Sequence, residues 1–211
     1  MTEPKDPCAA VLVIPALNEE RAIRAVVQDA LAQCGKVIVV DDGSSDGTGA
    51  AIADLPVECI RHDAPQGKAS ALLDGFRRAL ELGAAGVLTM DGDGQHAAAD
   101  LPRLLAAAEK YPNRIVIGAR LQGRDATPGK NRFGNRQADF WVSWACGARV
   151  TDSQSGQRYY PRAAVELALR LPHDGFVFES EILIEAARRG MHTVSVPIMA
   201  RCDEDRRAGH L

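Results

Sequence analysis

The sequence predicts an α/β fold of the Rossmann-like kind, with a mostly parallel central sheet and helices on both faces. Short apolar runs alternate with helical patterns through the first half of the chain, which is typical of a parallel sheet covered on both sides. Several of these runs stop abruptly at acidic or polar clusters, as strands do when their carboxyl ends carry a ligand site. A length of 211 residues suits one domain that buries its own core.

Apolar runs and helical periodicity define the expected elements of the first half. The apolar runs predict strands over residues 11–14, 36–40, 57–61, 86–90 and 114–118. Apolar residues at helical spacing predict helices over residues 19–33, 67–82 and 101–110, and residues 43–48 are predicted to turn into a further helix. Asn18 is expected to cap the first helix, with Glu19 and Glu20 at its positive end.

The pattern changes after residue 120. Residues 121–130 are rich in Gly and Arg and are expected to form a loop. A helix is predicted over residues 131–146 with an aromatic face made of Phe133, Phe140, Trp141 and Trp144. Strands are predicted over 156–160 and 193–198 with a helix over 179–189 between them, and the charged tail 201–211 is expected to be flexible.

Composition narrows the class of protein. The chain is 46% hydrophobic and 25% charged, ordinary values for a soluble globular protein, and its net charge of −3 argues against nucleic acid as a partner. The five cysteines are scattered without metal-binding spacing, which indicates buried thiols in a reducing cytosol. The N-terminus has no signal-peptide character and no apolar run approaches the ~18 residues of a membrane span, so we expect a cytoplasmic protein.

The segment from Val87 to His96 carries the clearest chemical signal. An apolar run ends in Asp91-Gly-Asp93-Gly-Gln95, so two carboxylates at a strand end can turn toward one point. Oxygen ligands of this kind suit Mg²⁺ or Mn²⁺, which keep open positions for phosphate. The segment therefore predicts a metal-bound diphosphate at the carboxyl edge of the sheet.

Two further polar clusters follow predicted strands at the same edge. Asn18 and Glu19 follow the first strand, and Asp41 and Asp42 follow the second. Capping explains each cluster by itself, but three of them at equivalent strand ends favour a ligand site. No G-x-G-x-x-G motif or P-loop is present, so phosphate must be held by metal and by arginines, which accumulate after residue 114. A solvated basic surface is the alternative explanation for those arginines.

Motifs along most of the chain resemble family-two glycosyltransferases of the GT-A fold. They are Val13-Ile-Pro15-Ala-Leu-Asn18-Glu19, Val39-Val-Asp41-Asp42-Gly-Ser-Ser-Asp-Gly-Thr48, Gly67-Lys68-Ala-Ser-Ala-Leu72 and Met90-Asp91-Gly-Asp93-Gly-Gln95-His96. Asp152-Ser-Gln154-Ser-Gly156-Gln-Arg158 and Phe178-Glu179-Ser-Glu181 are similar to the branch of dolichyl- and polyprenyl-phosphate mannosyl- and glucosyltransferases. The resemblance implies one domain over 1–211, with a disordered N-terminus at 1–10. It further implies a nucleotide-sugar-binding half at 11–120 and an acceptor-binding half at 121–200.

The resemblance also implies a set of site residues. The catalytic candidates are Asp93, Asp152 and Arg132, and the metal candidates are Asp91, Asp93 and Gln95, with Mg²⁺ or Mn²⁺ as cofactor. The candidates for binding the nucleotide sugar are Pro15, Leu17, Glu19, Val39, Asp41, Lys68, Asp91, Gly92, Arg120, Arg136, Gln154, Arg201 and Arg206.

The implied reaction is inverting transfer of a hexose from a nucleotide diphosphate sugar, UDP- or GDP-linked, to an acceptor. If the acceptor is a polyprenyl phosphate, its oxygen is already anionic because the second phosphate pKa is about 6, and no protein base is needed. If the acceptor is a hydroxyl, a carboxylate must take the proton, with Asp152 as first candidate and Glu179 as second. The aromatic helix then packs in the core, or contacts the inner membrane face or a polyprenyl chain.

Two other functions stay open at this stage. A nucleotidyltransferase should carry a Gly-rich basic loop after the first strand, where this chain has Ala16-Leu17-Asn18-Glu19. A nucleotide-sugar sensor without catalysis would retain tight metal-dependent binding but show no turnover.

Overall fold

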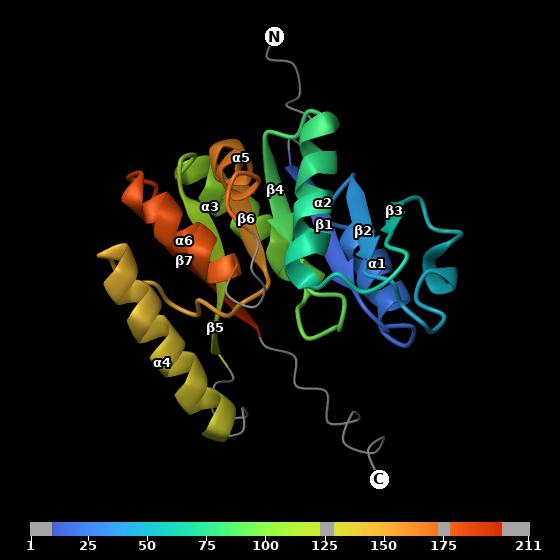
Figure 1. The fold of residues 1–211 in the computed structure, drawn as a ribbon, viewed down its shortest axis with the longest axis horizontal. Helices are drawn as coiled ribbons and strands as arrows, with labels where there is room; N and C mark the ends of the chain where they lie inside the picture. The colour runs from blue at the N-terminus through green and yellow to red at the C-terminus, as the bar shows by residue number, and fades with distance from the viewer. Residues whose placement is uncertain (1–9, 123–128, 173–177, 200–211) are drawn as a thin grey trace.

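The structure is a computed structural model that describes residues 10–122, 129–172 and 178–199, with only the course of the backbone at residues 121–122 and 129–136. In the described residues, a seven-stranded sheet runs in the order β3-β2-β1-β4-β6-β5-β7 (Figure 1). Its strands are β1 (Ala10–Ala16), β2 (Val37–Asp41), β3 (Glu58–Arg61), β4 (Gly86–Thr89), β5 (Ile115–Gln122), β6 (Arg158–Pro161) and β7 (Thr193–Met199).

Neighbouring strands run parallel except at β6, which is antiparallel to both β4 and β5. The prediction of a mostly parallel α/β sheet is confirmed. The reversal of β6 puts its amino end beside the carboxyl ends of β4 and β5, so the loop before Arg158 joins the same edge of the sheet.

Helices cover both faces of the sheet. They are α1 (Ile23–Leu31), α2 (Lys68–Glu81), α3 (Leu101–Lys110), α4 (Gly129–Cys146), α5 (Arg162–Ala168) and α6 (Phe178–Arg188), with short 3₁₀ turns η1 (Ala50–Ile52) and η2 (Ala98–Asp100). None of these described helices combines the length and the apolar character that a membrane span requires.

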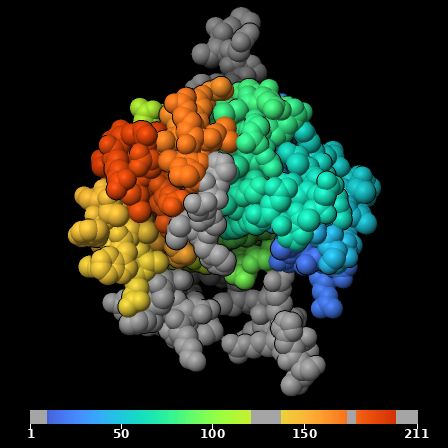
Figure 2. Space-filling model, viewed as in Figure 1, coloured from blue at the N-terminus to red at the C-terminus, as the bar shows by residue number. Residues whose placement is uncertain are grey.

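The two apolar layers follow from strand geometry, because successive side chains of a strand point to opposite faces. Val11 and Val13 of β1 pack in the layer that contains α2, α5 and α6. Leu12 and Ile14 pack in the layer that contains α1 and α3. Figure 2 shows the first half of the chain on one side of the view and the second half on the other, with α2 and α5 adjacent between them. The functional division of the chain at residue 120 stays a prediction.

Three local predictions are corrected by the structure. Helix α1 begins at Ile23, with Ala22 as its N-cap, so Asn18 does not cap it. Asn18 instead adopts a left-handed backbone with φ of 56° and accepts a 2.9 Å hydrogen bond from the Ser45 backbone amide. The further helix expected after the turn at 43–48 is only the short 3₁₀ turn η1, and within the turn the Asp46 carboxylate accepts the hydrogen bonds of the Thr48 amide and hydroxyl.

The second half contains one unpredicted helix and one unexpectedly exposed face. Helix α5 follows directly after Pro161, and its seven residues are too short to show clear periodicity. The possibility that the aromatic face of α4 packs in the core is wrong for Phe140, Trp141 and Trp144, which are 62%, 60% and 73% exposed. Phe133 lies outside the described side chains.

Candidate active site

A cleft lies where the carboxyl ends of β1 and β4 meet the first turn of α2. It has a volume of about 260 Å³ and is partly open to solvent. Its lining includes Pro15, Ala16, Leu17, Glu19, Asp42, Gly67, Lys68, Ala71, Asp91, Gly92 and Asp93. Segments distant in sequence, each predicted to end at the same sheet edge, therefore do surround one cavity.

Lys68 connects two carboxylates at this cleft. Its ammonium nitrogen lies 2.7 Å from Asp91 Oδ1 and 3.1 Å from Glu179 Oε2. Burial opposes the charge of Lys68, but the charges of Glu179 and Asp91 outweigh burial and raise the pKa of the lysine. Burial likewise opposes the charge of Asp91, yet His96 and Lys68 lower the pKa of this carboxyl far below its usual range. Asp91 is therefore ionised, and it is already ion-paired with the Lys68 ammonium.

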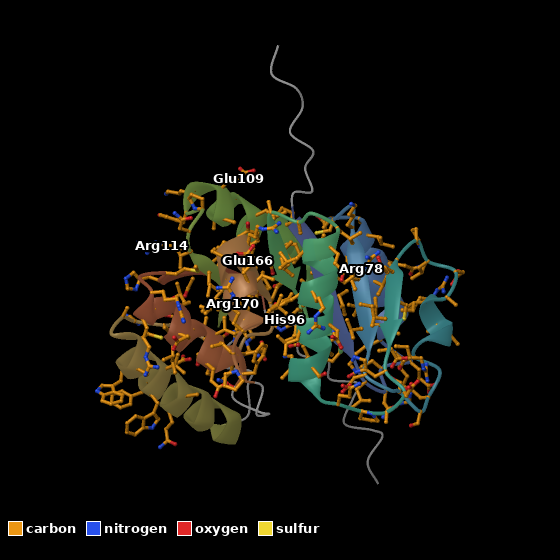
Figure 3. All side chains as sticks on the ribbon, turned by 45° about the horizontal axis from the view of Figure 1, so that its top comes forward. Arg78, His96, Glu109, Arg114, Glu166 and Arg170 are labelled. Carbon is orange, nitrogen blue, oxygen red and sulfur yellow. The ribbon has the colours of Figure 1, made fainter. Side chains whose placement is uncertain are left out.

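His96 lies behind Asp91 in the interior of the molecule (Figure 3). Its Nε2 is 3.4 Å from Asp91 Oδ2. Its buried Nδ1 meets no hydrogen-bond partner among the described residues. The sequence motif contained this histidine, but only the fold shows that it orients the first aspartate of the pair.

Asp93 and Gln95 lie in the loop after β4. Asp93 Oδ1 accepts a 2.9 Å hydrogen bond from the Gln95 amide, and the Gln95 side chain is exposed. In the described part of the chain, no group of three or more His, Cys, Asp or Glu side chains lies close enough together to bind a metal ion by itself. A magnesium site needs only one or two carboxylates, since water and substrate phosphate complete its octahedron. The oxygen donors of Asp91 and Asp93 fit such an open site.

Gly156 is required beside Asp91 because a side chain there has no room. A Cβ at residue 156 would collide with the Asp91 carboxylate. The carbonyl of Gly156 accepts a 2.8 Å hydrogen bond from the Thr89 hydroxyl, which joins the 152–156 loop to the end of β4. The backbone of this loop therefore forms one wall behind Asp91.

Arg120 and Asp152 form a two-point ion pair beside this loop. Arg120 Nε and Nη2 donate to the two carboxylate oxygens at 2.8 and 2.7 Å, and the Arg120 amide donates to Oδ2 at 2.8 Å. The hydrogen bonds to Asp152 raise the pKa of Arg120 against the effect of burial. Asp139 of α4 accepts hydrogen bonds from the amides of Asp152 and Ser153 at 3.1 and 2.7 Å. Asp152 is therefore ion-paired with the Arg120 guanidinium, and its backbone is bound by Asp139 of α4.

A buried histidine fixes the entry to α2. Asp42 accepts hydrogen bonds from the amides of Gln66 and Gly67, both at 2.8 Å. His62 bridges Asp42 Oδ1 at 2.7 Å and Asp74 Oδ2 at 3.0 Å. These contacts hold the turn that presents Lys68 to the cleft. Nothing in the local sequence marked His62, because its two partners lie 20 and 12 residues away.

Asp41 is fully buried and paired with a residue that sequence reasoning did not single out. Arg61 Nη1 donates to Asp41 Oδ2 at 2.8 Å, and the Ser44 amide donates to Oδ1 at 2.9 Å. Arg61 and His62 offset the repulsion between the neighbouring carboxylates of Asp41 and Asp42. Asp41 sits behind the cleft lining, and Arg61 is half exposed beside it.

Arg158 is the largest fully buried side chain. Its guanidinium donates to the carbonyls of Ser155 and Ser153 at 2.8 and 2.6 Å, to the Tyr160 hydroxyl at 3.0 Å and to the Glu179 carbonyl at 3.1 Å. It therefore ties the 152–156 loop to the first turn of α6, from which Glu179 reaches Lys68. The sequence signal that could have indicated this role is the position of a charged residue, Arg158, within the predicted strand 156–160.

The remaining predicted residues fall into separate groups. Val39 is buried in the core layer with α1, so only its backbone is available to a ligand. Gln154 is exposed, 3.5 Å from the Ser153 hydroxyl. The side chains of Arg132 and Arg136, and residues Arg201 and Arg206, lie outside the described part of the structure.

Comparison with known proteins gives a consistent result. A family model described as Glycosyl transferase family 2 matches residues 11–168. The UDP-N-acetylglucosamine–dolichyl-phosphate N-acetylglucosaminyltransferase of Methanococcus voltae is 31% identical over 89% of this chain and 83% of its own. The undecaprenyl-phosphate mannosyltransferase of Micrococcus luteus is 32% identical over 88% of this chain and 81% of its own. The polyprenol monophosphomannose synthase of Mycolicibacterium smegmatis is 30% identical over 89% and 76%.

A solved structure supports the fold. Glucosyl-3-phosphoglycerate synthase from Mycobacterium tuberculosis, in complex with Mn²⁺, uridine diphosphate and glucosyl-3-phosphoglycerate, matches with a TM-score of 0.70. The match covers 95% of this chain and 74% of that chain at 20% sequence identity. At this identity the likeness establishes the architecture, and the expected GT-A fold is confirmed.

Proposed function

The chain belongs to glycosyl transferase family 2, and we propose that it transfers a hexose from a nucleotide diphosphate sugar to a polyprenyl phosphate. The observation that carries this proposal is the similarity, over about nine-tenths of the chain, to three transferases named for dolichyl, undecaprenyl or polyprenol phosphate acceptors. The cleft at the ends of β1 and β4 is the proposed donor site.

The cleft suits a nucleotide diphosphate sugar by its shape and charge. Pro15 and Leu17 offer apolar surface for the nucleoside, and Glu19 offers a carboxylate for ribose hydroxyls. Lys68 offers a cation for diphosphate oxygens, and arginines such as Arg120 add charge-assisted contacts. In this proposal Asp91 and Asp93 hold a divalent cation; the solved structure of the same fold contains Mn²⁺ together with uridine diphosphate. A bound Mg²⁺ or Mn²⁺ would stabilise the charge of the departing diphosphate.

The commitment of Asp152 to Arg120 favours an anionic acceptor over a hydroxyl acceptor. A general base must reach the proton that it removes. Both oxygens of Asp152 are instead hydrogen-bonded to the Arg120 side chain. A polyprenyl phosphate brings its own anionic oxygen, so the residues at this position need only place the acceptor and exclude water. We propose that Asp152 positions Arg120, and that Arg120 meets a phosphate.

The first experiment tests the reaction itself. The full chain is incubated with UDP- and GDP-linked hexoses, a polyprenyl phosphate in detergent, and Mg²⁺, Mn²⁺ or EDTA, and the glycosylated lipid is measured. We expect transfer from one of these donors, lost with EDTA and in Asp91→Asn, and retained in Asp54→Asn. Asp54 is a suitable control because it is an exposed aspartate paired with Arg24 on the surface. Metal-dependent nucleotide binding without any transfer would instead support a non-catalytic sensor.

The second experiment separates a base from a positioning residue. Asp152→Asn and Arg120→Gln are compared singly and together. If Asp152 positions Arg120, either change should cost a similar factor in kcat/KM and the double variant should be little worse, because both remove the same contact. If Asp152 is the base, Asp152→Asn alone should abolish turnover while Arg120→Gln keeps a measurable rate, and the polyprenyl phosphate assignment would fail.

A further inference from the structure

Helix α4 carries the most exposed aromatic surface among the described residues. Phe140, Trp141 and Trp144 are 62%, 60% and 73% exposed. Their rings contact one another edge to face, with centroids 5.3 Å apart for Phe140 and Trp141 and 6.2 Å apart for Trp141 and Trp144. We refer to these three residues as the aromatic face. They form one preassembled patch rather than separate exposed rings.

The other side of the same helix is anchored to the protein. Val142 is buried in the core layer that contains α6, and the Ser143 hydroxyl exchanges hydrogen bonds with the backbone of Val150 at 2.9 and 3.2 Å. The helix lies along α6 at the outer end of the sheet (Figure 1). The exposed position of the aromatic face is therefore set by packing and is not a loose end of the chain.

The charge of α4 indicates what covers the aromatic face. Its sequence contains Lys130, Arg132, Arg136 and a single acidic residue, Asp139. The Asp139 carboxylate accepts hydrogen bonds from the amides of residues 152 and 153 and from the Ser153 hydroxyl, so it is turned toward the protein. A helix whose sequence is basic and whose described part exposes Trp and Phe matches an anionic lipid surface, where indole rings settle at the headgroup level.

The position of α4 connects this surface to the candidate active site. Asp139 directly precedes Phe140 of the aromatic face, and its carboxylate binds the loop that carries Asp152. Asp152 in turn holds Arg120, the arginine assigned above to phosphate. A helix resting on a bilayer would therefore place Arg120 close to a phosphate that is anchored in that bilayer.

We propose that the aromatic face of α4 is a docking surface for the headgroup region of an anionic lipid bilayer. The purpose of this docking depends on the proposed function, because it would deliver a membrane-embedded phosphate acceptor to the site. The evidence for docking is the exposure, the ring contacts and the sequence charge of α4. The occupant is the lipid surface, and a second copy of this chain is the competing outcome.

The chain provides its own probe, because its two tryptophans are both in the aromatic face. The full chain is mixed with vesicles of phosphatidylcholine alone, or of phosphatidylcholine with phosphatidylglycerol, with no nucleotide sugar or polyprenyl phosphate present. We expect a blue shift of tryptophan emission and co-sedimentation with the anionic vesicles, both reduced by added salt. Brominated lipids should quench the same emission.

Matched variants test whether the aromatic face is responsible. Phe140→Ser/Trp141→Ser/Trp144→Ser should weaken vesicle partitioning by at least about tenfold while keeping the far-ultraviolet circular dichroism of the wild type. The control is Tyr111→Ser, which removes an aromatic ring flanked by Lys110 and Arg114. Tyr111 follows α3 and is not part of α4, so this control should bind vesicles like the wild type.

Each outcome separates this proposal from the proposed function. Absent vesicle binding, or equal binding by the triple variant, overturns the docking surface even if the protein transfers sugar to a short-chain polyprenyl phosphate in detergent. Vesicle binding that requires the aromatic face supports it even if no transfer is found. A concentration-dependent blue shift without vesicles, together with dimers in size-exclusion chromatography, would assign the face to a second copy and overturn the lipid assignment.

Discussion

Replacing Lys68 with methionine tests the charge balance of the candidate metal site. In the structure one ammonium is shared by Asp91 and Glu179 at 2.7 and 3.1 Å. Methionine keeps much of the side-chain length and removes the charge, which leaves two neighbouring carboxylates without their common partner. The variant should therefore be less stable in the absence of metal.

The size of this effect follows from the exposure of the lysine. The Lys68 side chain is 44% exposed, so each contact is screened by water and contributes about 0.5–1 kcal/mol rather than the value of a fully buried pair. Two contacts then amount to about 1–2 kcal/mol, or roughly 3–6 °C in Tm for a chain of this size. The measurement is thermal unfolding by circular dichroism in EDTA, without nucleotide.

Adding Mn²⁺ gives the decisive comparison. A divalent cation binding at Asp91 must displace the ammonium in the wild type but not in Lys68→Met, so the same Mn²⁺ concentration should raise the Tm of the variant more. Lys110→Met is the control, since Lys110 lies over the Tyr111 ring and away from the cleft. Equal Mn²⁺ effects on wild type and Lys68→Met, or no loss of stability in EDTA, would refute this account of the site.

Three further changes test the residues around the cleft. Gly156→Ala should weaken Mn²⁺ binding, measured by calorimetry, by roughly 10- to 100-fold because the new Cβ displaces the Asp91 carboxylate; unchanged affinity would mean that Asp91 is not a ligand. Arg158→Met should lower the free energy of unfolding in urea by about 3 kcal/mol or more, because several buried acceptors lose their donor, and a loss under about 1 kcal/mol would contradict that role. The contacts of His62 with two carboxylates outweigh burial and raise its pKa above the ordinary 6.5. The stability that wild type has over His62→Gln should thus be fully present below pH 6.5 and lost as pH rises through the folded pKa, whereas a pH-independent difference would exclude a charged His62.

Much of the fold was predictable because local patterns reflect burial. The strands β1, β2 and β4 are continuous apolar runs, as expected for strands covered on both faces. The helical stripe over 67–82 became α2 because its apolar residues share one face. Elements without such a pattern were missed or misplaced, as α5 and the turn after Gly43 show, since short segments are decided by hydrogen bonds and neighbours.

The candidate site was predictable to the extent that it lies at strand ends. Asp91, Asp93 and Glu19 line the cleft because parallel strands bring their carboxyl ends to one edge. Their partners were not predictable from local sequence. Glu179 reaches Lys68 across more than half of the chain, and the backbone reversal at β6 was needed to bring the Gly156 wall against Asp91.

By itself, the order of polar clusters along the chain determined the family, the α/β class and the edge of the sheet where chemistry must occur, because each depends on residues close together in sequence. Only the tertiary structure decided which charges neutralise one another and which surface stays open to solvent. Asp152 proved to be bound by Arg120, and the rings of Trp141 and Trp144 proved to face outward. The physical reason is that ion pairing and solvent exposure depend on distances through space, and helical or strand periodicity specifies a face without specifying what lies against it.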